Sequence, residues 1–484
     1  MLYSVLNNQV RMKHILIIVF AFLTSYSFGQ EIWSLERCIQ LAQQNNLDYK
    51  LANVGIKTAY VDEKQSKEQR YPSLNMSTDL GLNMGRSVNP ATYTFETKTS
   101  SYNSFGIQSS TPIYLGGRIN NTIDQNKVNV EIAKADAQNI LNNTSLNVAA
   151  AYLQIVLSEE QVDIANKRLD QTKRQLEQIE KLIAAGTRPQ NEKLDVLAQI
   201  AKADQNLLTA ENNVILNYLN LKQLLQIDPG YSMKVQRMNI EIPKDANPDI
   251  YTLSSVYGSA VSNLPVIKAS ELRILSAEKG LAIAKGVGLP SIYLNISAGT
   301  NYTNLGTRVD NISYIYTPIS VRINGNPSVL DFPDKDISTS KNPYFNQLSE
   351  NIGGGAGITV RVPIYNNGTI RAQKEKAMLN IRSAEIRNEQ TKQQLKTDIQ
   401  RSIANAKAAL KQYEATVTTY NAALAAFENA EKRYKIGAIS TYDFNTSRTT
   451  MDTSLVDVTL AKYDYIFKLK VVEFYEGKKL SINN

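Results

Sequence analysis

The sequence predicts a mainly helical fold that also contains transmembrane β-strands, arranged as two copies of one unit. Three observations lead to this prediction. Helix-breaking residues recur at matching intervals in the two halves of the chain, and the long intervals carry apolar residues at every seventh position. Each half also contains two segments of about ten residues in which apolar and polar residues alternate. A sevenfold apolar repeat is typical of a coiled coil, and the alternation is typical of a strand with one face in lipid.

Residues 1–29 are expected to be a signal peptide. The segment begins with basic residues around Met12, continues with a short apolar run over 15–23, and ends in small residues at Gly29. This apolar run is too short to span a bilayer, so a cleaved leader is favoured over a membrane anchor. Either Met1 or Met12 could be the start. The leader contains the only histidine, so the exported protein is expected to lack this residue type.

The two halves share four intervals between helix breakers. Pro112 and Pro363 are 251 residues apart, and so are Gly186 and Gly437. A run of 68 residues without Gly or Pro precedes each of these glycines, and a run of 39 such residues follows soon after it. Chance does not produce four matching intervals, so the chain is interpreted as a tandem duplication.

Each repeat is expected to contain the same elements in the same order, namely a helix, a strand pair, a long helix and a shorter helix. The first repeat covers 30–228, with strands 72–84 and 102–114 and helices 117–185 and 188–228. The second covers 251–476, with strands 290–302 and 351–365 and helices 368–436 and 438–476. Residues 229–250 join the repeats and 477–484 form a tail. The second repeat has about 33 additional residues within 301–350, a proline-rich stretch that is interpreted as a long loop.

The long helices are predicted from their sevenfold apolar repeat. The repeat consists of Leu141, Val148, Ile155, Val162, Leu169, Leu176 and Ile183 in the first copy, and of Ile399, Ala406, Tyr413, Tyr420, Phe427 and Tyr434 in the second. A helix of this length is a rod of roughly 100 Å, which no globular core accommodates. Each rod is expected to turn back at Gly186 or Gly437. The returning helix and the helix before the strand pair would then stack end to end.

The strands are predicted from alternation, which is clearest in Leu74, Met76, Thr78, Leu80, Leu82 and Met84. Pro72, Pro112, Pro290 and Pro363 are expected at the strand boundaries, where a residue without an N–H group stops the hydrogen-bond ladder. Tyrosines near the strand ends are typical of a membrane–water interface. Asp79 and Arg361 fall on the polar, lumen-facing phase, where they would tune selectivity or pair with each other.

Four strands cannot close a barrel, and open sheet edges are not tolerated in hydrocarbon. Other chains are therefore expected to complete the wall. Two chains would give eight strands, whose interior side chains normally fill, and three would give twelve strands around an open channel. The inward residues are mostly Ser, Asn and Gly, which favours three chains.

Other kinds of site are not favoured. The glycine-rich stretch 351–360 precedes a strand rather than a helix, so it does not predict a phosphate-binding loop. Asp331, Asp334 and Asp336 lack the further ligands of a cation site. Cys38 follows charged residues, which does not fit a lipid attachment site, and it is expected to be buried in a helix. No set of nucleophile and base is visible, so the chain is not expected to be an enzyme or to hold a cofactor or metal. The pI is about 9.1, but no basic stripe is present, so nucleic-acid binding is not expected either.

The complete layout resembles the TolC-like outer membrane efflux proteins, also called outer membrane factors, over essentially the whole exported chain. The resemblance implies a homotrimer with a twelve-stranded barrel in the lipid of a Gram-negative outer membrane, continuous with a helical tunnel in the periplasm. It also implies a periplasmic adaptor and an inner-membrane pump as partners, and passive export by efflux or by type I secretion. Neither the transported substrate nor the pump is indicated. The alternative considered is a trimeric coiled-coil surface fibre or adhesin with a β-barrel anchor.

The resemblance further implies a periplasmic gate beside the second tip. The tyrosine that the family carries three residues before the tip glycine corresponds to Tyr434, before Gly437. The aspartate six residues after the glycine corresponds to Asp443. The usual arginine two residues after it is replaced by Ile439, and a second aspartate is replaced by Thr446, so half of the charged contacts are missing.

In the first copy the same comparison assigns gate positions after Gly186. Glu192 lies six residues after this glycine and is the expected acidic partner. Asn191 stands where the family usually has a threonine. Gly186 and Gly437 are also where the resemblance places the contacts with the adaptor.

Overall fold

The computed structural model describes residues 32–88, 94–237 and 247–478. The expected signal peptide, residues 1–29, and most of the expected tail lie outside these ranges. The chain forms two compact units. One comprises the described parts of 1–57, 131–272 and 385–484 and is helical, whereas the other comprises 58–130 and 273–384 and contains the main sheet.

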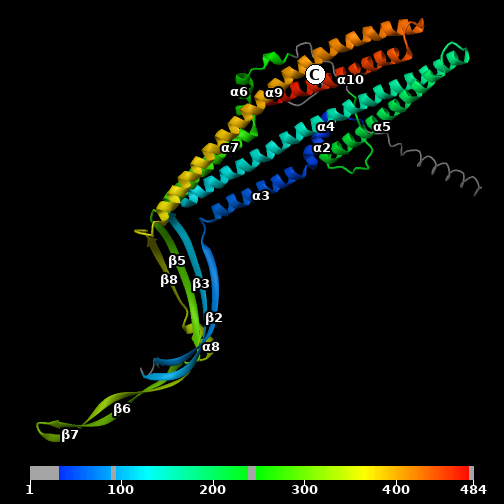
Figure 1. The fold of residues 1–484 in the computed structure, drawn as a ribbon. Helices are drawn as coiled ribbons and strands as arrows, with labels where there is room; N and C mark the ends of the chain where they lie inside the picture. The colour runs from blue at the N-terminus through cyan, green and yellow to red at the C-terminus, as the bar shows by residue number, and fades with distance from the viewer. Residues whose placement is uncertain (1–31, 89–93, 238–246, 479–484) are drawn as a thin grey trace, which may run out of the picture. The chain divides into compact units, whose positions relative to one another are not determined.

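Two sets of helices of equal length reveal the duplication (Figure 1). The first set is α2 (Leu35–Asn45), α3 (Leu47–Glu68), α4 (Arg118–Ala184) and α5 (Asn191–Leu225). The second is α6 (Leu253–Asn263), α7 (Pro265–Gly286), α9 (Thr369–Lys435) and α10 (Thr441–Tyr475). In both sets the lengths are 11, 22, 67 and 35 residues. Among the helices of the described residues, none carries an apolar stretch long enough to cross a membrane.

The helix expected before each strand pair is in fact two helices. Helix α2 ends at Asn45, the following Asn46 has a non-helical backbone (φ −51°, ψ 122°), and α3 begins at Leu47. In the second copy, α6 ends before Leu264 and α7 begins with Pro265. A proline disfavours helical backbone in the residue before it, which accounts for the second break. At the first break, the side chain of Asn46 accepts a hydrogen bond of 2.7 Å from the N–H of Tyr49 and so caps the start of α3.

The main sheet has four strands in the order β2 (Ser73–Val88), β3 (Phe95–Leu115), β5 (Ser291–Thr303) and β8 (Gly353–Arg361), and all neighbours are antiparallel. The register groups the side chains into two faces. One face is mostly apolar and includes Leu74, Met76, Leu80, Phe105, Ile107, Ile292, Leu294, Ile296, Ile358 and Val360. The other face is polar or lacks side chains and includes Asn75, Ser77, Asp79, Ser104, Gln108, Asn295, Ser297, Gly355 and Gly357.

Two expectations about strand boundaries are wrong. Pro112 lies within β3 rather than at its end, because β2 stops pairing at Ser110 and a register shift between Pro112 and Tyr114 accommodates the missing N–H group. Strand β8 ends at Arg361, so Pro363 lies beyond the ladder. Pro72 and Pro290 directly precede β2 and β5, as expected.

The interpretation of 301–350 as a loop is also wrong. The segment forms a hairpin of β6 (Thr307–Ile323) and β7 (Asn326–Lys341), followed by the short helix α8 (Tyr344–Glu350). Asn324 and Gly325 both have positive φ values, of 54° and 84°, as a tight hairpin turn requires. Every strand of a two-stranded ribbon has a free edge, so prolines that would disrupt a central strand are tolerated here.

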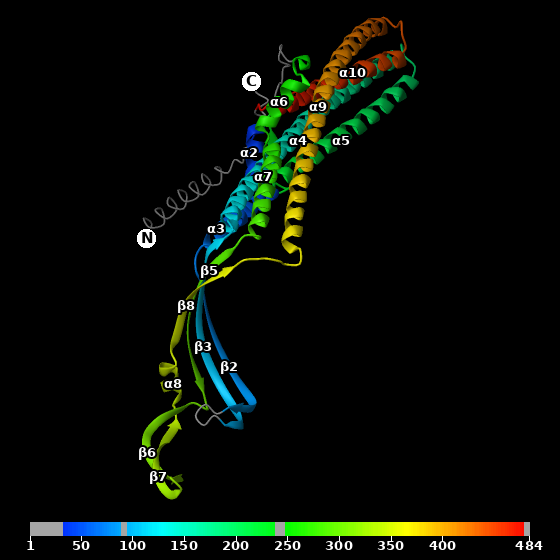
Figure 2. The same cartoon turned by 90° about the vertical axis from the view of Figure 1, so that its left-hand side faces the viewer.

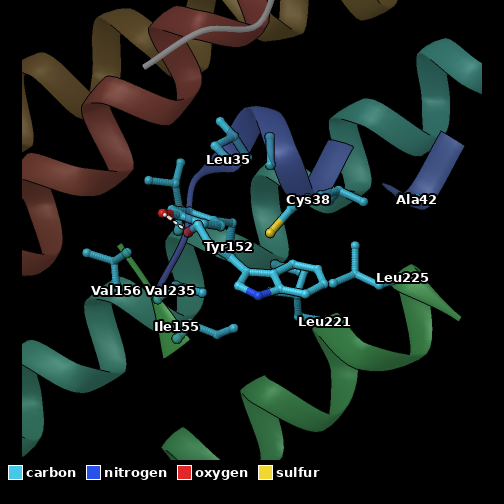
Figure 3. Close-up of a cluster of buried hydrophobic side chains, with 14 of the residues drawn as sticks. Leu35, Cys38, Ala42, Tyr152, Ile155, Val156, Leu221, Leu225 and Val235 are labelled. Atoms are coloured by element: carbon cyan, nitrogen blue, oxygen red, sulfur yellow. Dashed lines mark hydrogen bonds between the residues drawn. The ribbon is translucent and has the colours of Figure 1, made fainter. Parts of the chain in front are cut away.

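The helical unit has a core at equivalent positions of the two copies. Val148 and Ile155 of α4 and their counterparts Ile399 and Ala406 of α9 are all fully buried, in agreement with the predicted seam. Figure 3 shows the first cluster, in which Cys38 is buried as expected. Further side chains around it include Leu35, Tyr152, Leu221, Leu225 and Val235.

Tyr152 attaches the segment after the first repeat to this core. Its hydroxyl lies 2.8 Å from the carbonyl oxygen of Gln236 and 3.1 Å from that of Trp33. Trp33 is the last residue of the two-residue strand β1 (Ile32–Trp33), and Gln236 directly follows β4 (Lys234–Val235), which pairs with β1 in parallel. Burial raises the pKa of the Tyr152 hydroxyl, which therefore stays protonated and able to donate a hydrogen bond.

Candidate functional site

The candidate site lies where the two helical hairpins turn. Helix α4 connects to α5 through Gly186, and α9 connects to α10 through Gly437; the two turns lie side by side in both views (Figures 1 and 2). The glycines have φ values of +72° and +75°, and no atom would contact an added Cβ within 4 Å. The turns therefore need glycine for its backbone conformation and not for space.

Both turns have the same hydrogen-bond pattern. The N–H of Gly186 donates to Ile183 and that of Thr187 to Leu182, and the corresponding bonds recur from Gly437 and Ala438 to α9. This Schellman pattern satisfies the last carbonyl groups of a helix, with glycine in the left-handed conformation. Both long helices are thus terminated by the same local signal.

Side chains from the two turns form one polar and aromatic group, which we call the tip cluster and which comprises Arg188, Glu192, Tyr434, Thr441 and Phe444. Thr441 Oγ1 donates a hydrogen bond of 2.6 Å to Glu192 Oε2, and the Tyr434 hydroxyl lies 3.3 Å from Thr441 Oγ1. Arg188 Nη1 pairs with Glu192 Oε1 at 3.4 Å.

Aromatic contacts complete the tip cluster. The guanidinium of Arg188 lies 5.1 Å from the ring centroid of Tyr434, which is within the range of a cation–π interaction. The Tyr434 ring also stacks on Phe444, with 4.5 Å between the ring centroids and an interplanar angle of 13°. Phe444 and Thr441 are buried, so the cluster holds the start of α10 against the first hairpin.

Two of the four expected gate residues, Tyr434 and Glu192, lie in the tip cluster, and two do not. Asp443 is exposed and lies in the first turn of α10, which Ser440 caps: the Ser440 hydroxyl oxygen accepts from the Asp443 N–H at 3.0 Å and donates to the Asp443 carboxylate at 2.7 Å. Asn191 is exposed at the first residue of α5, and its side chain makes no hydrogen bond within the described ranges. The hydroxyl of Thr446 donates to the carbonyl of Tyr442 within α10.

The sequence reasoning missed Arg188, Thr441 and Phe444. A signal for Arg188 was present, because this residue stands two positions after Gly186 and is therefore the counterpart of Ile439 in the duplicated chain. The arginine that the resemblance places after the second tip glycine is thus found after the first. Thr441 carried no comparable signal, because its importance comes from its contact with Glu192 of the other hairpin, whereas Phe444 packs on Tyr434 and Phe427 of its own hairpin.

A second group of polar residues, most of them partly buried or exposed, lies between α4 and α10, further from the turns. Arg168 contacts Asp452 at 3.9 Å and donates to Thr449 at 3.1 Å, and Arg448 donates to Gln171 and Gln175. Burial raises the pKa of the Asp452 carboxyl and lowers that of the Arg448 guanidinium.

This second group is incompletely satisfied. Asn445 is 6% exposed, and neither polar atom of its side chain has a hydrogen-bond partner among the described residues. Buried polar groups without partners destabilise a contact. The packing of α10 on α4 is therefore weaker here than in the apolar layers.

The two charged residues on the polar face of the sheet belong to opposite edge strands. Asp79 of β2 accepts a hydrogen bond from the Ser104 hydroxyl at 3.4 Å. Arg361 of β8 lies opposite Ser291 in the register. Because β3 and β5 lie between the two edge strands, Asp79 and Arg361 do not pair directly within one chain.

A sheet with one apolar and one polar face, attached to long paired helices, defines a membrane channel of the barrel-and-helix class. The family model described as "Outer membrane efflux protein" matches residues 38–225 and 256–469. The chain therefore belongs to the outer membrane efflux protein family. Membership places it in the outer membrane of a Gram-negative bacterium, and the two matched ranges follow the two repeats.

Curated relatives and solved structures agree with this assignment. The chain is 23% identical to "Outer membrane protein TolC" of Salmonella enteritidis over 188 residues, which are 38% of each protein. It is 22% identical to the protein of that name from Escherichia coli (strain K12) over 213 residues, 43% of each. The alignments thus span about two fifths of these relatives.

Among solved structures, the Campylobacter jejuni CmeC outer membrane channel gives a TM-score of 0.72 at 17% identity, covering 94% of this chain and 90% of that one. The outer membrane protein VceC from Vibrio cholerae gives 0.71 at 16% identity, covering 92% and 97%. At such identities the likeness shows the fold. The predicted fold class, a duplicated combination of a membrane barrel and a helical tunnel, is confirmed.

Proposed function

We propose that three copies of this chain form a passive exit duct of a tripartite efflux or type I secretion system. The observation that carries this proposal is the two-faced sheet with unpaired edges. Strands β2 and β8 form its edges and run in opposite directions. The β8 edge of one copy can therefore pair antiparallel with the β2 edge of the next, which satisfies the backbone groups that hydrocarbon would leave without partners.

The residues on the polar face favour three copies. A twelve-stranded barrel has room for a water-filled lumen, whereas an eight-stranded barrel is normally filled by side chains. Small residues dominate this face, and β8 contributes Gly353, Gly355 and Gly357 to it. Such a face cannot fill a barrel interior, so an open duct accounts for it better. A surface fibre would not require a polar inner face.

The tip cluster supports a gate in the helical part of the duct. It connects the two hairpins of one chain through a few polar contacts, and the incompletely satisfied layer around Asn445 weakens the adjacent packing. Opening would move α10 and its partner helix away from the first hairpin. The exposed turns at Gly186 and Gly437 are then available to the hairpins of a periplasmic adaptor that connects the duct to an inner-membrane pump.

The proposal is tested with the purified protein in detergent and in planar bilayers. We expect a trimer by light scattering and a small, cation-preferring conductance, because a ring of three Asp443 carboxylates would attract cations. Asp443→Asn should weaken the cation preference. Ser440→Ala is the matched control, since it removes the hydroxyl that caps α10 and keeps the carboxylate. A water-soluble monomer, or a trimer without conductance, would contradict the proposal.

A further inference from the structure

We propose that helix α8 lies on the outside of the barrel at the boundary between the outer leaflet and water, where Phe345 inserts among the lipids. This inference rests on the proposed function in one respect, namely that the main sheet is part of a membrane wall. Helix α8 and the sheet belong to the same compact unit, and Figure 1 shows α8 beside the sheet at the end where β6 begins.

The contacts of α8 place it on the apolar face of the sheet. The Tyr344 hydroxyl donates a 2.7 Å hydrogen bond to Asn103 Oδ1, and its ring lies 4.7 Å from that of Tyr302. Thr300 Oγ1 donates to the carbonyl oxygen of Leu348 at 2.6 Å. In the register, Asn103 is opposite Tyr302 and Leu80, and Thr300 is opposite Phe105, so all of these residues belong to the apolar, outward phase.

Helix α8 also replaces β8 beside the end of β5. Strand β8 pairs with β5 only as far as Gly299, so the last residues of β5 have no strand on that side. The side chain of Gln347, which is buried, accepts from the N–H and donates to the carbonyl of Thr303, both at 3.0 Å. Asn351 donates to the carbonyl of Asn301 at 2.7 Å. These amide side chains satisfy backbone groups that a low-dielectric environment would not tolerate.

The position of α8 along the strand agrees with the thickness of a membrane. Tyr302 is ten residues from Ile292, the first apolar outward residue of β5. At about 3.4 Å per residue and a tilt of about 40°, this distance is roughly 26 Å across the membrane, close to the apolar band of about 25 Å in outer membrane barrels. The outward residues of β3 and β5 near α8 include the polar Asn103 and Thr300 beside the aromatic Phe105 and Tyr302, whereas those nearer Ile292 are aliphatic.

The composition of α8 fits an interfacial position. Phe345 is 80% exposed and packs edge to face on Tyr344 at 5.3 Å. Glu350, at the end of the helix, accepts a hydrogen bond from Asn342 and is exposed. Aromatic side chains at headgroup level, next to charged and amide groups, are typical of the girdles that border the apolar band. Inserting the phenylalanine ring among acyl chains removes its apolar surface from water, which is favourable.

The inference is tested by tryptophan fluorescence in phosphatidylcholine vesicles with bromine placed either high on the acyl chain or near its end. Trp33 is the only tryptophan and is buried, so Trp33→Phe gives a silent background for Phe345→Trp. We expect the upper bromines to quench Phe345→Trp more than the lower ones. If Trp33→Phe does not fold, Phe345→Trp is introduced into the wild-type chain, and the fluorescence of Trp33 measured in the wild type is subtracted.

Two control reporters separate the possible outcomes. Met76→Trp, at a 71% exposed position of the apolar face, should be quenched most by the lower bromines, and Tyr442→Trp, at a 75% exposed tip position, by neither. If Phe345→Trp is not quenched while Met76→Trp is, α8 lies in water or under a neighbouring chain and the inference is wrong. If Met76→Trp is not quenched either, the membrane wall itself is refuted.

Discussion

Replacing Glu192 with alanine should open the duct. The Glu192 carboxylate accepts the short, 2.6 Å hydrogen bond of the Thr441 hydroxyl, and Thr441 is 3% exposed. A hydrogen bond to a charged group contributes about 1.5–3 kcal/mol. The ion pair with Arg188 adds under about 1 kcal/mol, since both side chains are partly exposed. We therefore expect a loss of about 2 kcal/mol in each chain.

This loss corresponds to a roughly thirtyfold shift toward the open tip per chain, because 1.4 kcal/mol is about a factor of ten. The assay is the open probability of single trimers in planar bilayers. Glu192→Gln keeps an oxygen that can accept from Thr441 and loses the charge that pairs with Arg188, so it should lie between wild type and alanine. Asn191→Ala, at the exposed neighbouring position, should leave the gate unchanged.

A result that refutes this reasoning is easily recognised. If Glu192→Ala assembles as a trimer with wild-type thermal stability and its open probability matches that of Asn191→Ala, the tip cluster does not hold the gate closed. Loss of the trimer would instead show that Glu192 contributes to folding or assembly. The thermal unfolding temperature of each variant distinguishes these outcomes.

Three further predictions concern Gly437 and Cys38. Gly437→Ala should destabilise the protein by about 1 kcal/mol, because the φ of Gly437 is +75°. The control, Gly258→Ala in the exposed interior of α6, should be neutral or stabilising. Equal unfolding temperatures of the two variants would contradict this prediction. Burial raises the pKa of the Cys38 thiol to about 12, so maleimide should label this thiol only after unfolding. Rapid labelling of the folded trimer would contradict this prediction. Between about pH 8.5 and about pH 12 the thiol keeps its proton in the folded protein and ionises in the unfolded one, so the free energy of unfolding should fall as the pH rises. This free energy should fall less steeply with pH in Cys38→Ala.

The long helices and the two faces of the sheet could be predicted because both depend on local signals. Seam residues such as Val148 and Ile399 mark a helix face by spacing alone, and alternation from Leu74 onward marks a strand face in the same way. The tip glycines were found for a similar reason, since a left-handed residue ends a helix whatever surrounds it. The duplication provided two independent copies of each signal.

The sequence does not predict the hairpin of β6 and β7, because its prolines argue against strands. That inference holds for a central strand, which needs every N–H group, and fails for a ribbon with free edges, where Pro318 and Pro333 are tolerated. The Asn324–Gly325 pair between apolar segments was the local signal that could have revealed the turn. Pro112 was misplaced for the same reason, since a register shift accommodates it within β3.

The sequence alone determined the repeat, the rods and their turns, and the strands with one face for lipid, because periodicity and backbone preference act over a few residues. Only the tertiary structure decided that Thr441 meets Glu192, 249 positions away, and that α8 packs on the outward face beside Tyr302. Such contacts depend on how two separately formed elements pack together. No spacing within either element contains that information.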